Sequence, residues 1–288
     1  MAKKEKVTIG NIWGSIYPAL LYLLITSVVA YVLLKVGHHI VVNNKSINIK
    51  AIDDNMSMLI TFFSAVVTIP LLIVIKYLDV RKQKMLGGYG YRSVFFAKYL
   101  LIIPFAAAFM YAANCLVALI EIFVPSIAHS FDDAAKAIYG ADMWIQIVTA
   151  VLLGPIVEEL IFRGLMYIRL KRMFGQGVAA FVTGLLFGIF HWNISQGIYA
   201  FLFSYAAIFI YEKYKNICAP IIMHIAANAI SVLVSFMVKD YNNQSGATNS
   251  ASKGSSNWLG LLIICIVSAA ICGLFAYAIR KWVDPKRK

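Results

Sequence analysis

The sequence predicts an all-α, polytopic membrane protein with about eight transmembrane helices. Of its 288 residues, 61% are hydrophobic and 14% are charged, and the mean hydropathy is +0.78. A soluble domain has about half apolar and about a quarter charged residues. The composition therefore excludes a soluble globule and a disordered chain.

Eight apolar stretches are candidate spans, because one crossing of a bilayer takes about 20 residues. They cover residues 16–36, 58–78, 97–123, 144–170, 178–192, 198–214, 217–238 and 258–280. The first is longer than the core of a signal peptide and has no small-residue cleavage site close behind it. We therefore expect it to remain as an anchor.

The basic residues predict the orientation of the chain. There are 26 Lys and Arg against 13 Asp and Glu, a formal net charge of +13. With the N-terminus in the cytoplasm, about 19 bases, Lys76 among them, lie on the cytoplasmic side and about 6 on the other. We expect both termini in the cytoplasm and an attraction to anionic headgroups of the lipid bilayer. No basic face interleaves with base-stacking aromatic residues, so we expect no nucleic-acid partner.

Ionisable side chains inside the fourth span are a functional signal, because each costs roughly 2.5–3.5 kcal/mol on insertion scales. Gly154-Pro155 predicts a kink or a restart of the helix just before them. Glu159 and Arg163 are spaced and ordered for an ion pair on one helix face. Glu158 lies about 100° further round, and we expect it to face a polar cavity. The alternative is that both acids serve helix packing.

Two further spans carry polar groups one helical turn apart. Phe187 precedes His191 in the fifth span, and His224 precedes Asn228 in the seventh. A rise of 1.5 Å per residue places Glu158 and His191 about 20 Å from the cytoplasmic surface, and the other pair about 12–18 Å. A lone histidine is often a packing residue, but this common depth favours one shared site.

These residues resemble the motifs of the CPBP family of intramembrane proteases. In chain order the motifs are Glu158-Glu159-x-x-x-Arg163, Phe187-x-x-x-His191 and His224-x-x-x-Asn228. The family includes the type II CAAX prenyl endopeptidases and bacterial proteins of the Abi or bacteriocin-immunity type. The resemblance covers about residues 144–238 and leaves no motif residue substituted, whereas residues 1–143 match only the family's helix count.

The resemblance implies a catalytic core and an expected location in a bacterial plasma membrane. The expected regions are N-terminal transmembrane helices 1–3 with loops (1–143), the catalytic core of helices 4–7 (144–238), a flexible polar outer loop (239–257), and a C-terminal helix with a basic cytoplasmic tail (258–288). The implied partner is a membrane-associated peptide or protein substrate.

Peptide hydrolysis needs an activated water, a stabilised oxyanion and a proton for the leaving amine. Glu158 could take a proton from water, His191 could orient that water or act as an acid, and His224 and Asn228 could donate to the oxyanion. The family implies the same four catalytic residues, with Glu159, Arg163 and Phe187 in support.

The sequence is compatible with a reaction that uses a metal ion and with one that does not. Glu158, His191 and His224 would suit one zinc ion with an open fourth position for water. Local spacing enforces no ligand set, and no His-Glu-x-x-His is present, so we favour a reaction that requires no cofactor.

Two other functions compete with an intramembrane endopeptidase. One is a non-proteolytic membrane scaffold or bacteriocin-immunity-type protein, against which the intact motifs argue. The other is a proton-coupled transporter, since acids and histidines also form relays. No internal repeat is visible in the sequence, which makes a transporter less favoured.

Overall fold

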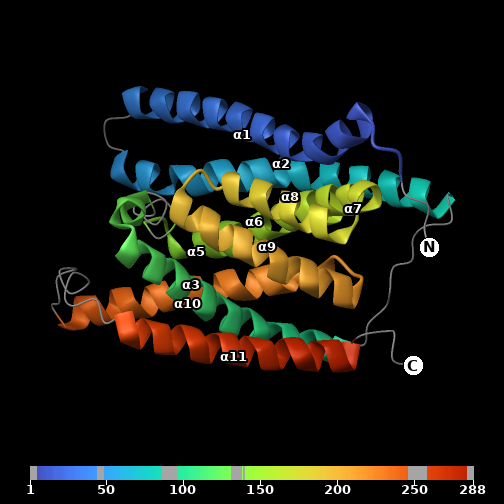
Figure 1. The fold of residues 1–288 in the computed structure, drawn as a ribbon. Coiled ribbons are helices and arrows are strands. Elements are labelled where there is room, and N and C mark those ends of the chain that lie inside the picture. Colours follow the sequence, from blue (N-terminus) through green and yellow to red (C-terminus); the bar gives the residue numbers. More distant parts are fainter. Residues whose placement is uncertain are drawn as a thin grey trace.

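The computed structural model describes residues 5–43, 49–85, 96–130, 138, 140–245 and 258–283. These described residues are mainly helical and contain no strand (Figure 1). The elements are α1 (Ile9–Asn43), α2 (Ile49–Met85), η1 (Phe96–Leu101), α3 (Ile102–Phe123), η2 (Pro125–Ser130), α5 (Met143–Gln146), η3 (Ile147–Leu153), α6 (Gly154–Glu159), η4 (Leu160–Tyr167), α7 (Ile168–Phe174), α8 (Gln176–Ile189), α9 (Ile194–Tyr214), α10 (Cys218–Ser245) and α11 (Trp258–Val283).

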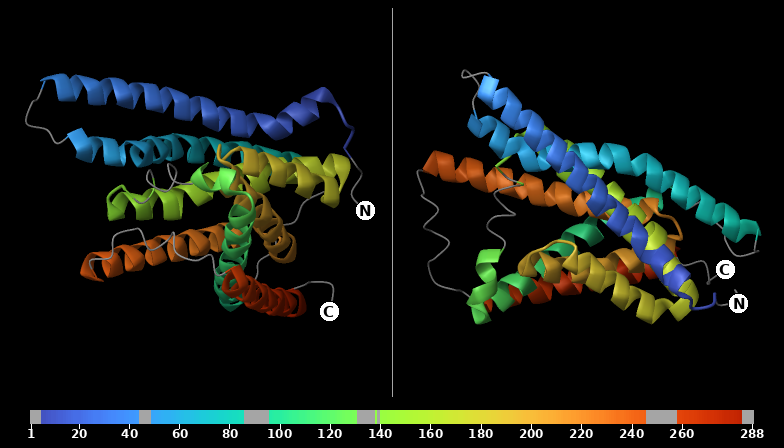
Figure 2. Two further views of the ribbon diagram at one scale, coloured as in Figure 1. Left: turned by 60° about the vertical axis from the view of Figure 1, so that its left-hand side comes forward. Right: turned by 90° about the horizontal axis from the view of Figure 1, so that it is seen from above.

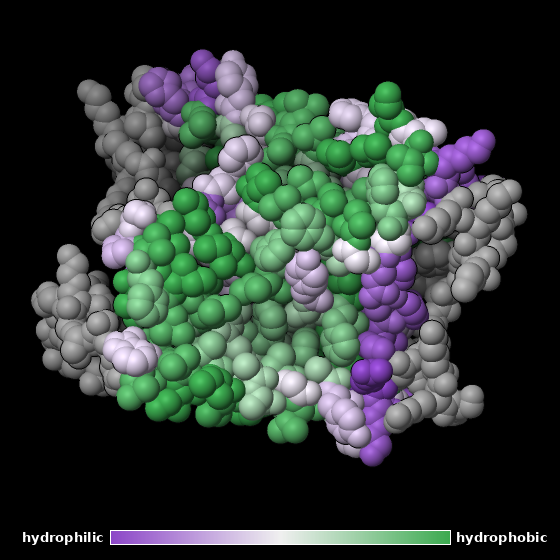
Figure 3. Space-filling model, in the orientation of Figure 1, coloured by the Kyte–Doolittle hydropathy of each residue, from purple (hydrophilic) through white to green (hydrophobic). Residues whose placement is uncertain are grey.

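The surface and the helix lengths together identify an integral, multi-pass membrane protein. Within the described residues, seven helices are long and apolar enough to cross a bilayer. Large apolar side chains such as Val28, Ile266 and Leu274 are exposed, and a broad apolar surface lies between hydrophilic ends (Figure 3). Exposed apolar area of this extent is what contact with lipid requires. The predicted all-α, polytopic class is confirmed.

The span Met143–Phe174, made of α5 to α7 with η3 and η4, is the most buried of the seven. The pair α1 and α2 lies on one side of it, and the pair α3 and α11 lies on the other (Figures 1 and 2). Helix α8 packs against α9, and α10 contacts both α3 and η3. The helix that carries the two adjacent acids therefore forms the centre of the bundle.

This central span changes its helical register at the point that the sequence indicates. The stretches η3 and η4 are π-helical, and α6 between them begins at Gly154-Pro155. The backbone N–H of Gly154 bonds to the carbonyl of Thr149, five residues earlier. A Cβ at Gly154 would lie 3.1 Å from that oxygen, so glycine suits the close approach. The helix continues through Gly154-Pro155 with a change of hydrogen-bond pattern, so the predicted restart is seen only as this change and not as a break.

Helix α8 corrects the prediction of a full-length span at 178–192. It has 14 residues, about 21 Å at 1.5 Å per residue, which is less than the roughly 30 Å hydrocarbon core of a bilayer. The helix ends because residues 190–193 turn, with Trp192 at φ 57°. His191 therefore lies in the turn after the helix. Apolar composition alone did not reveal this early end.

One further prediction needs correction, and one base that was counted for the orientation is buried. Helix α10 continues to Ser245, so the polar loop predicted at 239–257 begins later. Apolar content marks where a helix leaves lipid, whereas a helix can continue in water; residues 246–257 lie outside the described residues. Lys76, counted among the bases on the cytoplasmic side, is buried, and its Nζ donates to the carbonyl of Gly164 at 3.0 Å. The missing side chain of Gly164 leaves room for this approach.

One end of the bundle gathers the first described residues, the end of α11 and many ion pairs. Arg172 pairs with Glu5 and Asp79, and Lys98 donates to the carbonyl of Trp282. Because α1 begins and α11 ends at this same end (Figure 1), the described helices pass through the bundle an even number of times. The short α8 therefore counts as a pass beside the seven long helices.

Candidate active site

Glu159 is the buried centre of the polar residues in the bundle. Its Oε1 accepts from Nη1 of Arg163 at 3.0 Å, and both side chains are 0% exposed. The predicted ion pair is confirmed. His224 on α10 joins it, with Nδ1 at 2.9 Å from the same oxygen. The pair therefore also connects the central span to α10.

The contact with Glu159 orients the imidazole of His224. A carboxylate accepts hydrogen bonds, so we assign the proton to Nδ1, which leaves Nε2 as the acceptor nitrogen. This tautomer does not suit the oxyanion donor role expected of His224 from the sequence. That Nε2 lies 3.8 Å from Oε2 of Glu158. This Glu158 oxygen is buried and has no hydrogen-bond partner among the described residues. A polar separation of this length suits a bridging water.

His191 and Asn228 are each anchored to backbone carbonyls. Nδ1 of His191 lies 2.8 Å from the carbonyl of Phe187, so that nitrogen carries the proton and Nε2 is its acceptor nitrogen. Nδ2 of Asn228 donates to the carbonyl of Ala150 at 2.8 Å. The amide has a second N–H, which is available for another acceptor.

The four predicted catalytic side chains line one cavity of about 190 Å³. They are Glu158, His191, His224 and Asn228, and Phe187 lines it with them. Glu158 is 24% exposed, in contrast to the fully buried Glu159. The structure therefore brings together residues from the central span, α10, and α8 with the turn that follows it.

Aromatic rings enclose the charged groups. The guanidinium of Arg163 lies 4.4 Å from the ring centroid of Phe187 and 5.8 Å from that of Phe203. The Phe203 ring is 4.6 Å from the imidazole of His224. Cation–π contacts of this kind stabilise a desolvated guanidinium. Phe203 on α9 was not predicted, because one more aromatic residue in an apolar helix gives no signal.

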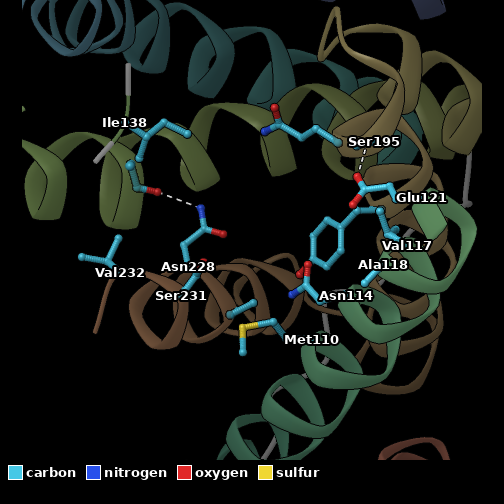
Figure 4. Close-up of a pocket in the computed structure, with 14 residues that line it drawn as sticks. Met110, Asn114, Val117, Ala118, Glu121, Ile138, Ser195, Asn228, Ser231 and Val232 are labelled. Carbon is cyan, nitrogen blue, oxygen red and sulfur yellow. Dashed lines mark hydrogen bonds between the residues drawn. The ribbon is translucent and has the colours of Figure 1, made fainter. Parts of the chain in front are cut away.

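Figure 4 shows a second cavity, of about 310 Å³. It adjoins the first cavity and shares five lining residues with it: Ile138, Ala150, Gln196, Tyr199 and Asn228. Glu121 on α3 and Ser195 on α9 also line it, and the Ser195 hydroxyl donates to Oε1 of Glu121 at 2.5 Å. Glu121 was missed in the sequence although a signal existed, since it is an acid inside the predicted third span.

The candidate metal ligands have suitable chemistry, but they do not converge. In both histidines Nδ1 bonds to an acceptor, which leaves Nε2 as the nitrogen that could bind a metal. This arrangement is typical of zinc ligands. In the part of the chain that the structure describes, however, no three His, Cys, Asp or Glu side chains are grouped to hold a metal ion. These residues as arranged do not fit a zinc site.

Comparison with known proteins supports the resemblance seen in the motifs. Residues 140–230 match the family described as type II CAAX prenyl endopeptidase Rce1-like. A Bacillus subtilis (strain 168) protein, "Putative membrane peptidase YdiL", is 27% identical over 101 residues, which are 35% of this chain and 41% of that protein. The match thus spans less than half of the relative's length. No solved structure matches significantly.

The class that follows is an integral, multi-pass membrane protein whose core resembles membrane peptidases. The predicted resemblance is confirmed over the helices that carry all three motifs. The matched range includes Glu158, His191, His224 and Asn228.

Proposed function

We propose that this chain is an intramembrane endopeptidase that hydrolyses a peptide bond of a membrane-associated protein or peptide. The observation that carries this proposal is the 3.8 Å separation between Oε2 of Glu158 and Nε2 of His224, in a cavity, with His224 held from behind by Glu159. A water between these two atoms would meet two acceptors. Its remaining lone pairs would point into the cavity.

The first step is attack by this water on the substrate carbonyl carbon. Glu158 takes one proton from the water as the new C–O bond forms, so the carbonyl oxygen becomes an oxyanion. The second N–H of Asn228 is a donor for that oxyanion, because its first N–H is bonded to Ala150. Nε2 of His191 lines the same cavity and is an alternative to Nε2 of His224 as acceptor of the water's second hydrogen, since one water donates only two hydrogen bonds.

The second step breaks the C–N bond. The protonated Glu158 delivers its proton to the leaving nitrogen while the oxyanion returns its electron pair to the carbonyl. The products are a carboxylic acid and an amine, and Glu158 is again a carboxylate. Glu159 and Arg163 stay paired throughout, so the imidazole of His224 keeps its orientation.

The test is hydrolysis by the full chain in phosphatidylcholine–phosphatidylglycerol vesicles that hold a library of membrane-inserted peptides. With the reaction in ¹⁸O-labelled water, the proposal predicts new carboxyl termini that carry the label, detected by mass spectrometry. If the purified chain yields no new termini from any peptide in the library, the proposal fails and a non-proteolytic scaffold is favoured.

A further inference from the structure

The second cavity holds an acid that the mechanism does not use. Glu121 lies near the end of α3, within a candidate membrane span, and is half-buried. It accepts a hydrogen bond from Ser195, and among the described residues no base forms an ion pair with it. An ionisable group inside a membrane span costs free energy, so Glu121 is a candidate functional residue.

The side chain of Glu121 lines the second cavity, together with other residues of α3. Met110, Asn114, Val117, Ala118 and Glu121 line it from one face of α3. Glu121 and Asn228 lie on opposite sides of the cavity, one from α3 and the other from α10 (Figure 4). Since Asn228 also lines the cavity of Glu158, a peptide bound at the reactive groups could extend one residue's side chain or its terminus towards Glu121.

The hydrogen bond from Ser195 keeps the carboxylate in place. The Ser195 hydroxyl donates to Oε1 of Glu121 at 2.5 Å, which holds that oxygen in place. Ser195 is buried and its hydroxyl also lies 3.1 Å from the carbonyl of Ile127. Only one of the two carboxylate oxygens takes part, so the other can accept from a ligand.

We infer that Glu121 recognises a cationic group of the substrate, an ammonium or a guanidinium, in the cavity beside Asn228. This inference rests on the proposed function, because it names a property of the same substrate. A carboxylate selects such a group by charge and by direct hydrogen bonds. The remaining walls, formed by Met110, Val117 and Val232 among others, accommodate the aliphatic stem of a lysine.

The experiment compares peptides that differ in charge at one position. Cleavage-site peptides from the library are remade with Lys, norleucine or Glu at each position near the scissile bond, with free and with acetylated N-termini. The readout is the ratio of kcat/KM for the Lys and norleucine peptides, so a general loss of activity cancels. The acetylated arm separates a side-chain cation from the terminal amine.

We expect the wild type to favour the cationic peptide by about 10- to 100-fold, since the pair is only partly desolvated. Glu121→Gln keeps an oxygen that can accept from Ser195 and should bring the ratio close to one. Glu121→Lys should favour the Glu peptide. Ser195→Ala is the matched control, because it removes the hydrogen bond, keeps the charge and should retain a cationic preference.

Equal ratios in the wild type and Glu121→Gln would overturn the inference while the proposed function stands. If the wild type cleaves no peptide, the proposed function fails, and the inference is then tested by the binding of library peptides remade with Lys or norleucine at each position. Binding is measured with the Glu158→Gln chain and fluorescent Lys and norleucine peptides. Tighter binding of the Lys peptide that disappears on adding Glu121→Gln supports the cation site, and equal binding contradicts it.

Discussion

Glu158 and Glu159 are neighbours in the chain, yet the structure gives them opposite surroundings. Glu159 is fully buried between Arg163 and His224. Glu158 lines a cavity and is 24% exposed. Two adjacent residues on a helix are turned by about 100° from each other, and this turn separates a structural acid from an acid that can meet water.

Glu159→Gln should destabilise the folded protein. The amide leaves Arg163 buried without its counter-charge and weakens the contact with His224, which costs about 3–5 kcal/mol for a broken buried pair. Thermal unfolding in one detergent should show a lower Tm and a lower yield of folded protein. The matched control is Glu158→Gln on the next residue, whose Tm should stay near the wild type. Equal Tm values for all three chains would contradict the structural role of Glu159.

Asn228→Ala should lower kcat by about 10²–10³, the usual effect of losing one oxyanion donor. Elemental analysis of the same preparation should show no change in metal content, because an amide is a poor zinc ligand. His191→Ala and His224→Ala provide the comparison, since their Nε2 atoms could bind zinc. Stoichiometric zinc in the wild type that is lost with activity in both histidine variants would contradict the metal-independent mechanism.

Much of the candidate site could be predicted because charge in a bilayer is expensive. Glu158, Glu159 and Arg163 stand out in an apolar segment for that reason. The contact between His224 and Glu159 could not be predicted, because it joins residues 65 positions apart and depends on how α10 packs. Glu121 shows the opposite case, since its charge was visible in the sequence but its cavity was not.

At the scale of the helices, the position of His191 depends on the close packing of α8 against α9. A Cβ at Gly188 would lie 2.7 Å from the carbonyl oxygen of Gly197, which is closer than real Cβ atoms approach. Neither backbone segment can shift to make room for this Cβ unless α8 or α9 moves as a whole. The early end of α8 and this contact both follow from tertiary packing, which hydropathy along the chain does not report.

Gly188→Ala should therefore lower stability by about 1–3 kcal/mol, the usual cost of overpacking. It should lower peptide cleavage as well, because α8 leads directly into His191. Gly177→Ala is the matched control in the same helix, since nothing lies within 4 Å of its added Cβ. Thermal unfolding and cleavage are compared for both variants. A Gly188→Ala chain as stable and active as Gly177→Ala would contradict the close contact.

At the scale of the whole molecule, the start of α1 and the end of α11 lie at one end of the bundle (Figure 1), and the excess of bases predicts that this end faces the cytoplasm. Among the described residues, the seven long apolar helices and the short α8 could be predicted, with their order, from apolar length. Their lengths could not, because α1, α2 and α10 extend beyond the apolar stretches, and helix ends in water are set by local backbone contacts.

Single-cysteine labelling in a cysteine-free background tests this topology in intact cells. Ser250→Cys, between α10 and α11, should react with an impermeant maleimide added outside. Glu5→Cys and Lys286→Cys should react only after permeabilisation. Labelling of Ser250→Cys from the cytoplasmic side alone would overturn the orientation and the charge argument behind it.

The most direct test of the central claim is the cleavage rate of the Glu158→Gln chain in the same vesicles as the wild type. The amide has almost the same shape as the carboxylate but cannot take a proton from water, so we predict no detectable cleavage at an unchanged Tm. Cleavage at the wild-type rate by a folded Glu158→Gln chain would contradict the assignment of Glu158 as the base.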